Sequence, residues 1–277
     1  EVLNNLNNIT LADIQECQQY FLDNSRGVIT ANIPTEHPEI ETEVIKFSEG
    51  LNTVKPNNIE IAKVYNPNSK PIVLSKANNN SQADIMMVHK FKREDSIKDS
   101  VLGELTNSIL TNSSIGLFNV LREKEHLAYS VYSNIEKNGD LGEISCNILT
   151  TTDNKDIGEI SYENVQKSID GFKNQINELK SGKFTEQDLE NAKLSLKANL
   201  LQMEGTEAKL NTLDLGLNSK YGITYSNQLY DEIDKITKED ILNYAEKIFK
   251  NPPIYSIVAS KDTLENNKDY LDKIKEA

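Results

Sequence analysis

Apolar and polar residues alternate along several stretches in the middle of the chain, a pattern typical of strands with one buried face. The alternating positions are Ala83, Ile85, Met87, His89 and Phe91 in one stretch, and residues 141–151 in another. Two short apolar segments, 59–65 and 71–76, flank the turn-forming residues 66–69 and predict a hairpin. The central part of the chain is therefore expected to form a sheet.

Longer stretches carry apolar residues three and four positions apart, which predicts amphipathic helices. These helices are expected over residues 95–110, 162–179 and 186 to about 217. Thr185, followed three residues later by Asp188, is a typical N-cap for the last of them. Because strands come first and long helices follow, we expect an α+β lobe with one face of its sheet covered.

Two segments at an offset of 227 residues share a pattern. The matching positions are Ile9, Thr10, Asp13 and Ile14 in the first and Ile236, Thr237, Asp240 and Ile241 in the second. Each segment begins a predicted helix that is followed by a strand and a further helix. In the first segment these are residues 9–21, 28–33 and 36–50. In the second segment the strand is 254–259 and the further helix is 264–274. The simplest interpretation makes residues 1–50 the closing helix, strand and helix of one lobe, and 51–277 a complete second lobe. Coincidence is the alternative, because a threonine-capped helix before a strand is common.

One segment, residues 116–133, combines both periodicities. Gly116 opens it, and a charged run at 122–125 separates a helical part from a strand-like part. The helical positions are Leu117, Phe118 and Leu121, and the alternating positions on one side of the strand are Leu127, Tyr129 and Val131. A helix, a charged corner and a strand would bring Arg122 within reach of Tyr129.

The order Leu117-Phe118, Leu121-Arg122-Glu123-Lys124, Leu127-Ala128-Tyr129-Ser130-Val131 resembles the signature of the M16 inactive domain. This is the carboxy-terminal, non-zinc half of the pitrilysin, insulysin and mitochondrial-processing-peptidase-like zinc peptidases. Residues 185–193 also resemble a long helix of that family. The resemblance implies a mixed, largely antiparallel sheet with long helices on one face. One residue departs from the pattern, since His126 stands where the family commonly has glycine.

The resemblance also implies roles for two residues. In the family, an arginine and a tyrosine seven positions apart close over the zinc site of the other lobe, and Arg122 and Tyr129 match them. Arg122 would bind the substrate backbone, and the Tyr129 hydroxyl would donate to the oxyanion of the transition state. Spacing alone also allows structural roles. Arg122 could extend off a helix face beyond Phe118, and Tyr129 could be a core aromatic beside Leu127 and Val131.

Other catalytic chemistry has little support in the sequence. The histidines His37, His89 and His126 occur in no two-histidine zinc motif, so no metal site is expected on this chain, and the resemblance places zinc on a companion lobe. No Gly-x-Ser-x-Gly elbow is present. Cys17 and Cys146 lie in no nucleophile or thiolate metal motif, and whether they pair is open.

The net charge of the chain limits the kinds of partner that it is expected to bind. A formal net charge of −13 without a basic block argues against nucleic acid. No apolar run approaches the roughly 20 residues of a membrane span. Acidic residues can serve solubility alone, or can favour basic peptides. Because the chain begins at Glu1 without an initiator methionine, we interpret it as a piece of a longer protein.

Together these observations predict the non-zinc half of an M16-like metallopeptidase, inactive by itself. It would close a peptide chamber with a zinc-bearing companion lobe, in the same polypeptide or on a partner subunit. It would supply Arg122 and Tyr129 to peptide-bond hydrolysis. The alternative is a catalytically inactive M16-like scaffold or peptide-binding subunit. Neither interpretation indicates a cellular compartment.

Overall fold

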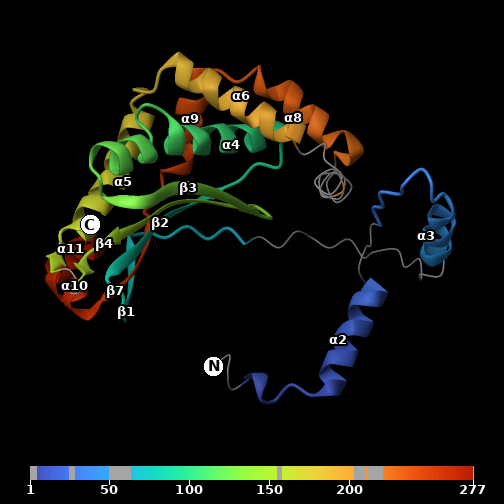
Figure 1. Cartoon of the computed structure of the whole chain (residues 1–277), viewed down its shortest axis with the longest axis horizontal. Coiled ribbons are helices and arrows are strands. Elements are labelled where there is room, and N and C mark those ends of the chain that lie inside the picture. Colours follow the sequence, from blue (N-terminus) through green and yellow to red (C-terminus); the bar gives the residue numbers. More distant parts are fainter. Residues whose placement is uncertain are drawn as a thin grey trace. The chain divides into compact units, whose positions relative to one another are not determined.

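The computed structural model describes residues 5–24, 29–49, 64–154, 158–202, 210 and 221–276. The chain divides into two compact units, the first made of residues 1–60 and 202–226 and the second of residues 61–201 and 227–277. The second unit contains the sheet predicted from the alternating patterns, together with most of the long helices (Figure 1).

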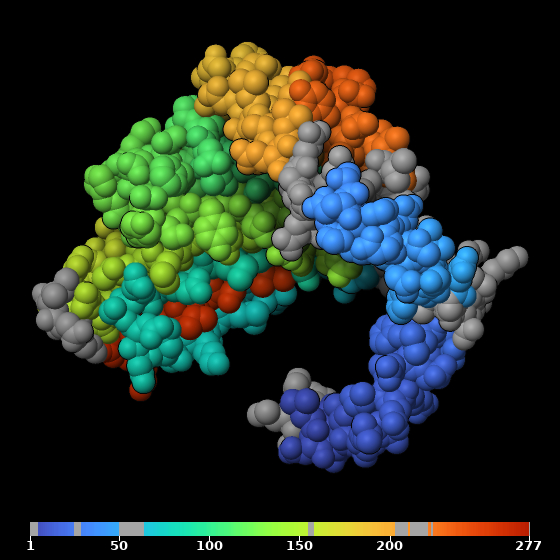
Figure 2. All heavy atoms as spheres, turned by 45° about the vertical axis from the view of Figure 1, so that its right-hand side comes forward, coloured from blue at the N-terminus to red at the C-terminus, as the bar shows by residue number. Residues whose placement is uncertain are grey.

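A five-stranded sheet forms the centre of the second unit. Its strands are β1 (Ile72–Asn78), β2 (Gln82–Lys92), β3 (Ala128–Asn138), β4 (Leu141–Thr151) and β7 (Ile254–Ser260). They lie in the order β1-β7-β2-β4-β3, with β1 and β7 parallel and the other pairs antiparallel. In Figure 2 the red atoms of β7 lie between teal atoms of the two earlier strands, as this order requires. The expectation of a mixed, largely antiparallel sheet is confirmed.

Helices cover one face of this sheet. They are α4 (Ile97–Asn112), α5 (Asn164–Lys180) and α9 (Lys238–Ile248), with α10 (Lys261–Asn266) and α11 (Lys268–Glu276) against β1. Two further helices, α6 (Glu186–Gln202) and α8 (Tyr225–Ile233), follow α5 in the chain, and a small hairpin pairs β5 (Asp153–Asn154) with β6 (Glu159–Ile160). Long helices therefore lie on one side, as predicted.

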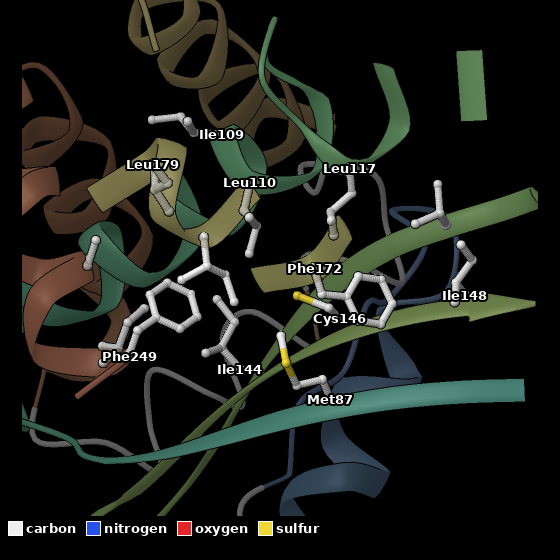
Figure 3. Packing of buried hydrophobic residues seen from close by; sticks show 14 of the residues in the cluster. Met87, Ile109, Leu110, Leu117, Ile144, Cys146, Ile148, Phe172, Leu179 and Phe249 are labelled. Atoms are coloured by element: carbon white, nitrogen blue, oxygen red, sulfur yellow. The ribbon is translucent and has the colours of Figure 1, made fainter. Parts of the chain in front are cut away.

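The core lies between the sheet and these helices. All five alternating positions of β2 are buried, and their neighbours on the other face, such as Asp84 and Met86, are exposed. Figure 3 shows Met87, Ile144, Cys146 and Phe172 in this core. The period-two pattern thus identified both the strands and the face that each one buries.

The first unit has α2 (Leu11–Asn24), α3 (Glu39–Glu49) and the short 3-10 helix η2 (Gly222–Thr224) among its described residues. Thr10 caps α2 as expected, because its backbone nitrogen donates to Asp13 Oδ2 at 2.7 Å and its hydroxyl accepts from the Asp13 nitrogen at 3.3 Å. Neither α2 nor α3 contains a buried residue. Within the described part of the chain, no helix has both the length and the apolar character needed to cross a bilayer.

Some expected elements differ from the structure. Residues 29–33 form no strand, because a strand needs a hydrogen-bonded neighbour and the described residues of the first unit contain none. Residues 64–65 are not in a strand either, and β1 pairs with β7. The first strand of the predicted hairpin lies mostly outside the described part, which omits residues 59–63. The expected continuation of α6 to about 217 also lies mainly outside it.

The closing helix predicted over 264–274 is two helices, α10 and α11, separated at Asn267. Asn267 is buried, and its Nδ2 donates to the carbonyl oxygens of Tyr162 and Thr263, each at 2.9 Å. A side chain that hydrogen-bonds backbone groups in this way competes with a continuous helix. The break therefore follows from a contact with residue 162, which is remote in sequence.

Candidate functional site

The segment that resembles a family signature begins with a tight turn after α4. A Cβ on Gly116 would come within 2.6 Å of the Thr111 carbonyl oxygen, so only glycine fits this approach of the backbone to itself. Asn119 donates from Nδ2 to the Ser113 carbonyl oxygen at 2.8 Å and satisfies an acceptor at the end of α4. The turn is thus defined by local backbone contacts.

The predicted helix after this turn is present as a π-helix, η1 (Phe118–Lys124). Leu117 and Leu121 are fully buried and anchor it to the core, where Leu117 lies near Phe172 (Figure 3). Gly171 of α5 allows the close packing, since a Cβ there would meet Leu121 Cδ2 at 2.5 Å. π-Helices are rare in proteins, and those that occur are frequently found at functional sites.

Hydrogen bonds to Asp188 connect the loop before Gly116 to the start of α6. Asp188 accepts hydrogen bonds from the Ser114 nitrogen at 2.9 Å and the Ser114 hydroxyl at 2.7 Å, and from the Thr185 nitrogen and hydroxyl, both at 2.8 Å. Burial alone would raise the pKa of Asp188, but the hydrogen bonds from Thr185 and Ser114 outweigh it and lower the pKa to about 2. The predicted cap of α6 therefore also fixes the loop before Gly116.

The corner between η1 and β3 is made by His126, which has a φ of 53°. This left-handed conformation suits glycine, and a side chain there adds strain, although histidine tolerates it better than most residues. This chain thus makes a left-handed corner with a residue other than glycine. The Leu127 nitrogen then donates to the Leu121 carbonyl oxygen at 2.9 Å and closes the corner.

Tyr129 lies at a β-bulge. Ala128 faces Thr150 and Ser130 faces Leu149, so Tyr129 is an extra residue between them. The expectation that Tyr129 shares a face with Leu127 and Val131 is wrong: those two are buried, whereas Tyr129 is 85% exposed. The bulge turns one side chain out of the alternation, as bulges beside active sites commonly do. A core role for Tyr129 is thereby excluded.

Arg122 and Tyr129 are in contact, as the helix-corner-strand pattern predicted. The Arg122 guanidinium carbon lies 4.9 Å from the centroid of the Tyr129 ring and 4.6 Å from that of Phe118. Its Nε lies 3.3 Å from Glu123 Oε1. A guanidinium in contact with two aromatic rings is attracted by both, and it keeps planar donors available at its edge.

Phe118 is the member of this cluster to which the sequence analysis assigned no role. Its spacing of four residues from Arg122 on a helix was the available signal, since such pairs lie on one face. That spacing was interpreted as a route for Arg122 to extend away from the helix. The structure shows that the Phe118 ring contacts the Arg122 guanidinium, so Phe118 helps to hold the arginine in place.

Each of the three histidines has its own local surroundings. His37 Nδ1 is 2.9 Å from Glu39 Oε1 in the first unit, His89 is buried under the helices with Nδ1 2.9 Å from the Asn251 carbonyl oxygen, and His126 is at the corner. Among the residues that the structure describes, no group of three histidine, cysteine or acidic side chains is arranged to hold a metal ion. Cys17 is exposed on α2, Cys146 is buried in β4, and both are free thiols.

The fold and the site together describe an α+β unit with an arginine and a tyrosine presented at an edge strand of its sheet. The chain belongs to the Peptidase M16 inactive domain family, whose model matches residues 8–196. It is 24% identical over 118 residues to the mitochondrial-processing peptidase subunit beta of Saccharomyces cerevisiae, an alignment that covers 42% of this chain and 26% of that protein.

Two solved structures share the fold. The peptidase M16 inactive domain from Pseudomonas fluorescens superposes with a TM-score of 0.70 at 18% identity, over 91% of this chain and 58% of that one. Pitrilysin superposes with a TM-score of 0.60 at 13% identity, over 91% of this chain and 26% of that one. The chain thus spans little more than half of the first structure and about a quarter of the second. It is an M16-like peptidase half.

We expect replacement of His126 by valine to lower the free energy of unfolding by about 1–2 kcal/mol, because a β-branched residue fits a φ of 53° poorly. His126→Gly should change it by less than about 0.5 kcal/mol or raise it, since glycine adopts this conformation without strain. Urea denaturation followed by circular dichroism measures both. Glu125→Val is the matched control, because Glu125 is the preceding exposed residue with a φ of −93°. Equal stability of the valine and glycine variants at 126 would contradict strain at this corner.

Proposed function

We propose that this chain closes one side of a peptide chamber and supplies Arg122 and Tyr129 to a zinc centre carried by a companion lobe. The observation that carries the proposal is the stacked pair itself: the guanidinium lies 4.9 Å from an exposed tyrosine ring at the bulge of an edge strand. A structural tyrosine would be expected to bury its ring. This one is turned outward with its hydroxyl available.

The chemistry of peptide hydrolysis gives each residue a role. Attack of a metal-activated water on the peptide carbonyl builds negative charge on the oxygen, and a donor aimed at that oxygen stabilises the transition state more than the ground state. The Tyr129 hydroxyl is the proposed donor. Arg122, in contact with the Phe118 ring as well, would bind a carbonyl oxygen of the substrate backbone with its planar donors.

The zinc would be held outside this chain. The companion lobe can lie in the same polypeptide or on a partner subunit, and a peptide is the substrate in either arrangement. The similarity to pitrilysin and to a mitochondrial-processing peptidase subunit supports both arrangements equally.

Residues 1–50 are proposed to be the closing part of a preceding lobe of the same design, and 51–277 the complete second lobe. In support, Thr10 and Asp13 form the same capping box as Thr237 and Asp240 at the matching positions. Thr185 and Asp188 form it as well, so the cap alone is weak support. The apolar side chains exposed on α2, Leu11, Ile14 and Phe21 among them, are those that a preceding lobe would cover.

The test is cleavage of an unstructured fluorogenic peptide by the full-length gene product, or by this chain mixed with a separately encoded zinc lobe. We expect cleavage that a chelator abolishes and zinc restores, and no cleavage by the 277-residue chain alone. Cleavage that withstands the chelator would refute a zinc peptidase. Peptide binding without cleavage in every combination would favour the scaffold, and a His-x-x-Glu-His helix in the companion lobe would favour the peptidase.

A further inference from the structure

A cavity of about 270 Å³ lies on the helix-covered side of the sheet, away from the residues proposed for catalysis. It is bounded by β2, β7, the second half of α5 and the end of α9. Its apolar wall is made by Met87, Ile176, Phe249, Pro253 and Tyr255. Because a water molecule occupies about 30 Å³ in the liquid, the cavity has room for a small organic molecule of about six carbons.

Two cations line the same cavity. Lys173 and Lys180 are seven residues apart on α5, which is about two turns, so they project from one face of the helix. The Lys173 ammonium nitrogen lies 5.7 Å from the ring centroid of Tyr255 and 5.8 Å from that of Tyr270. Among the described residues, no carboxylate lies within ion-pair distance of Lys173. The faces of two aromatic rings contribute to stabilising its charge.

The second cation has a weak partner. Lys180 Nζ lies 3.1 Å from Glu246 Oε2, and the Glu246 side chain is 61% exposed. Ion pairs of this kind contribute little because water screens them and the side chains lose freedom. Lys180 can therefore turn toward an anion in the cavity at small cost.

His89 and Asp170 are further titratable groups close to the two lysines. His89 is neutral at pH 7, because burial lowers its pKa to about 4 against the opposing hydrogen bond to Asn251, and Lys180 lowers it further. With Nδ1 bonded to the Asn251 carbonyl oxygen, the ring is fixed in orientation. Asp170, the acidic residue one turn before Lys173, accepts a hydrogen bond of 2.7 Å from the Tyr270 hydroxyl.

We propose that this cavity binds a small monocarboxylate with a short apolar tail. The carboxylate would lie between the Lys173 and Lys180 ammonium groups, and the tail would contact the apolar wall formed by Met87, Ile176 and Phe249. Both parts of the ligand follow from the lining, since a cationic end and an apolar end are present in one cavity. A bare anion would use only the two ammonium groups, and a neutral apolar molecule would use only the apolar wall.

The experiment is a titration of the 277-residue chain with hexanoate, hexanamide and inorganic phosphate, followed by NMR of the histidine rings and by calorimetry. The chain has only 3 histidines, so the His89 signals can be resolved and assigned. We expect hexanoate to shift the His89 signals and leave those of His37 and His126 in place, with a Kd on the order of 1 mM for a ligand of this size. Hexanamide and phosphate should each bind at least tenfold more weakly.

Variants complete the test. Lys173→Met should weaken hexanoate binding at least tenfold, whereas Lys167→Met, a change of an exposed lysine on the same helix, should leave it unaltered. Hexanamide binding as tightly as hexanoate would overturn the role of the lysines. Phosphate binding as tightly would overturn the role of the apolar wall. Absence of any His89 shift up to 20-fold above the roughly 1 mM expectation would overturn the site itself. The comparison of the three ligands uses the unmodified chain, so it does not depend on how a variant folds or on peptidase activity.

Discussion

Replacement of Tyr129 by phenylalanine is expected to lower the turnover of the assembled peptidase about 100-fold, in line with the loss of one oxyanion donor from an acyl-transfer site. The ring stays, so its contact with the Arg122 guanidinium is retained and only the hydroxyl is removed. The effect should fall on kcat more than on KM, because the donated hydrogen bond forms with charge that develops in the transition state.

Zinc content should be unchanged by Tyr129→Phe, because Tyr129 is proposed to act on the substrate and not on the metal. Metal analysis of the purified enzyme beside its steady-state kinetics measures both quantities. Tyr132→Phe is the matched control, since Tyr132 is an exposed tyrosine of the same strand outside the bulge. Turnover that is equal in the wild type and Tyr129→Phe would remove this hydroxyl from the mechanism, and a loss of zinc would indicate a structural effect.

Replacement of Lys247 by methionine is expected to lower the free energy of unfolding by about 3 kcal/mol, which is typical of removing one partner from a buried ion pair. Asp99, near the start of α4, is only 3% exposed, and its Oδ1 lies 3.2 Å from Lys247 Nζ on α9. Among the residues that the structure describes, its Oδ2 has no hydrogen-bond partner. Without Lys247 the carboxylate would be buried with no countercharge.

Urea denaturation of the variants measures this effect. The control is Lys98→Met: Lys98 makes an ion pair of 2.7 Å with Asp240 across the same two helices, but its side chain is 51% exposed. That change should cost less than about 1 kcal/mol. The double variant Asp99→Asn with Lys247→Met should recover part of the stability, since the unpaired charge is then absent. A loss from Lys247→Met no larger than that from Lys98→Met would contradict the assignment.

The sequence predicted which segments form helices and strands better than it predicted which strands pair with one another. The period-two pattern located β2 and β4, and threonine caps located the starts of α6 and α9, because these signals depend on residues close together in the chain. The pairing of β1 with β7 joins residues about 180 apart, and an apolar pattern does not identify a strand's neighbour. The pattern therefore located β1 without identifying β7 as its neighbour.

The candidate site shows the same division. The types and spacing of Arg122 and Tyr129, with the surrounding motif, were sufficient to bring the two residues together and to indicate the family. The orientation of Tyr129 was predicted wrongly because a bulge adds a residue to one strand only. Its presence depends on how β3 pairs with β4. The spacing of Phe118 and Arg122 indicated that they share a helix face, but only the structure showed that one guanidinium contacts both the Phe118 and Tyr129 rings.

By itself, the sequence determined the α+β class, the buried faces of the strands, the caps of the helices and the family, since each is encoded in periodicity or in a contiguous motif. Only the tertiary structure decided the strand order, the outward position of Tyr129 and the cationic cavity beside His89. These features arise where segments remote in the chain meet. A single side chain's surroundings there are set by packing and charge contributed by several elements at once.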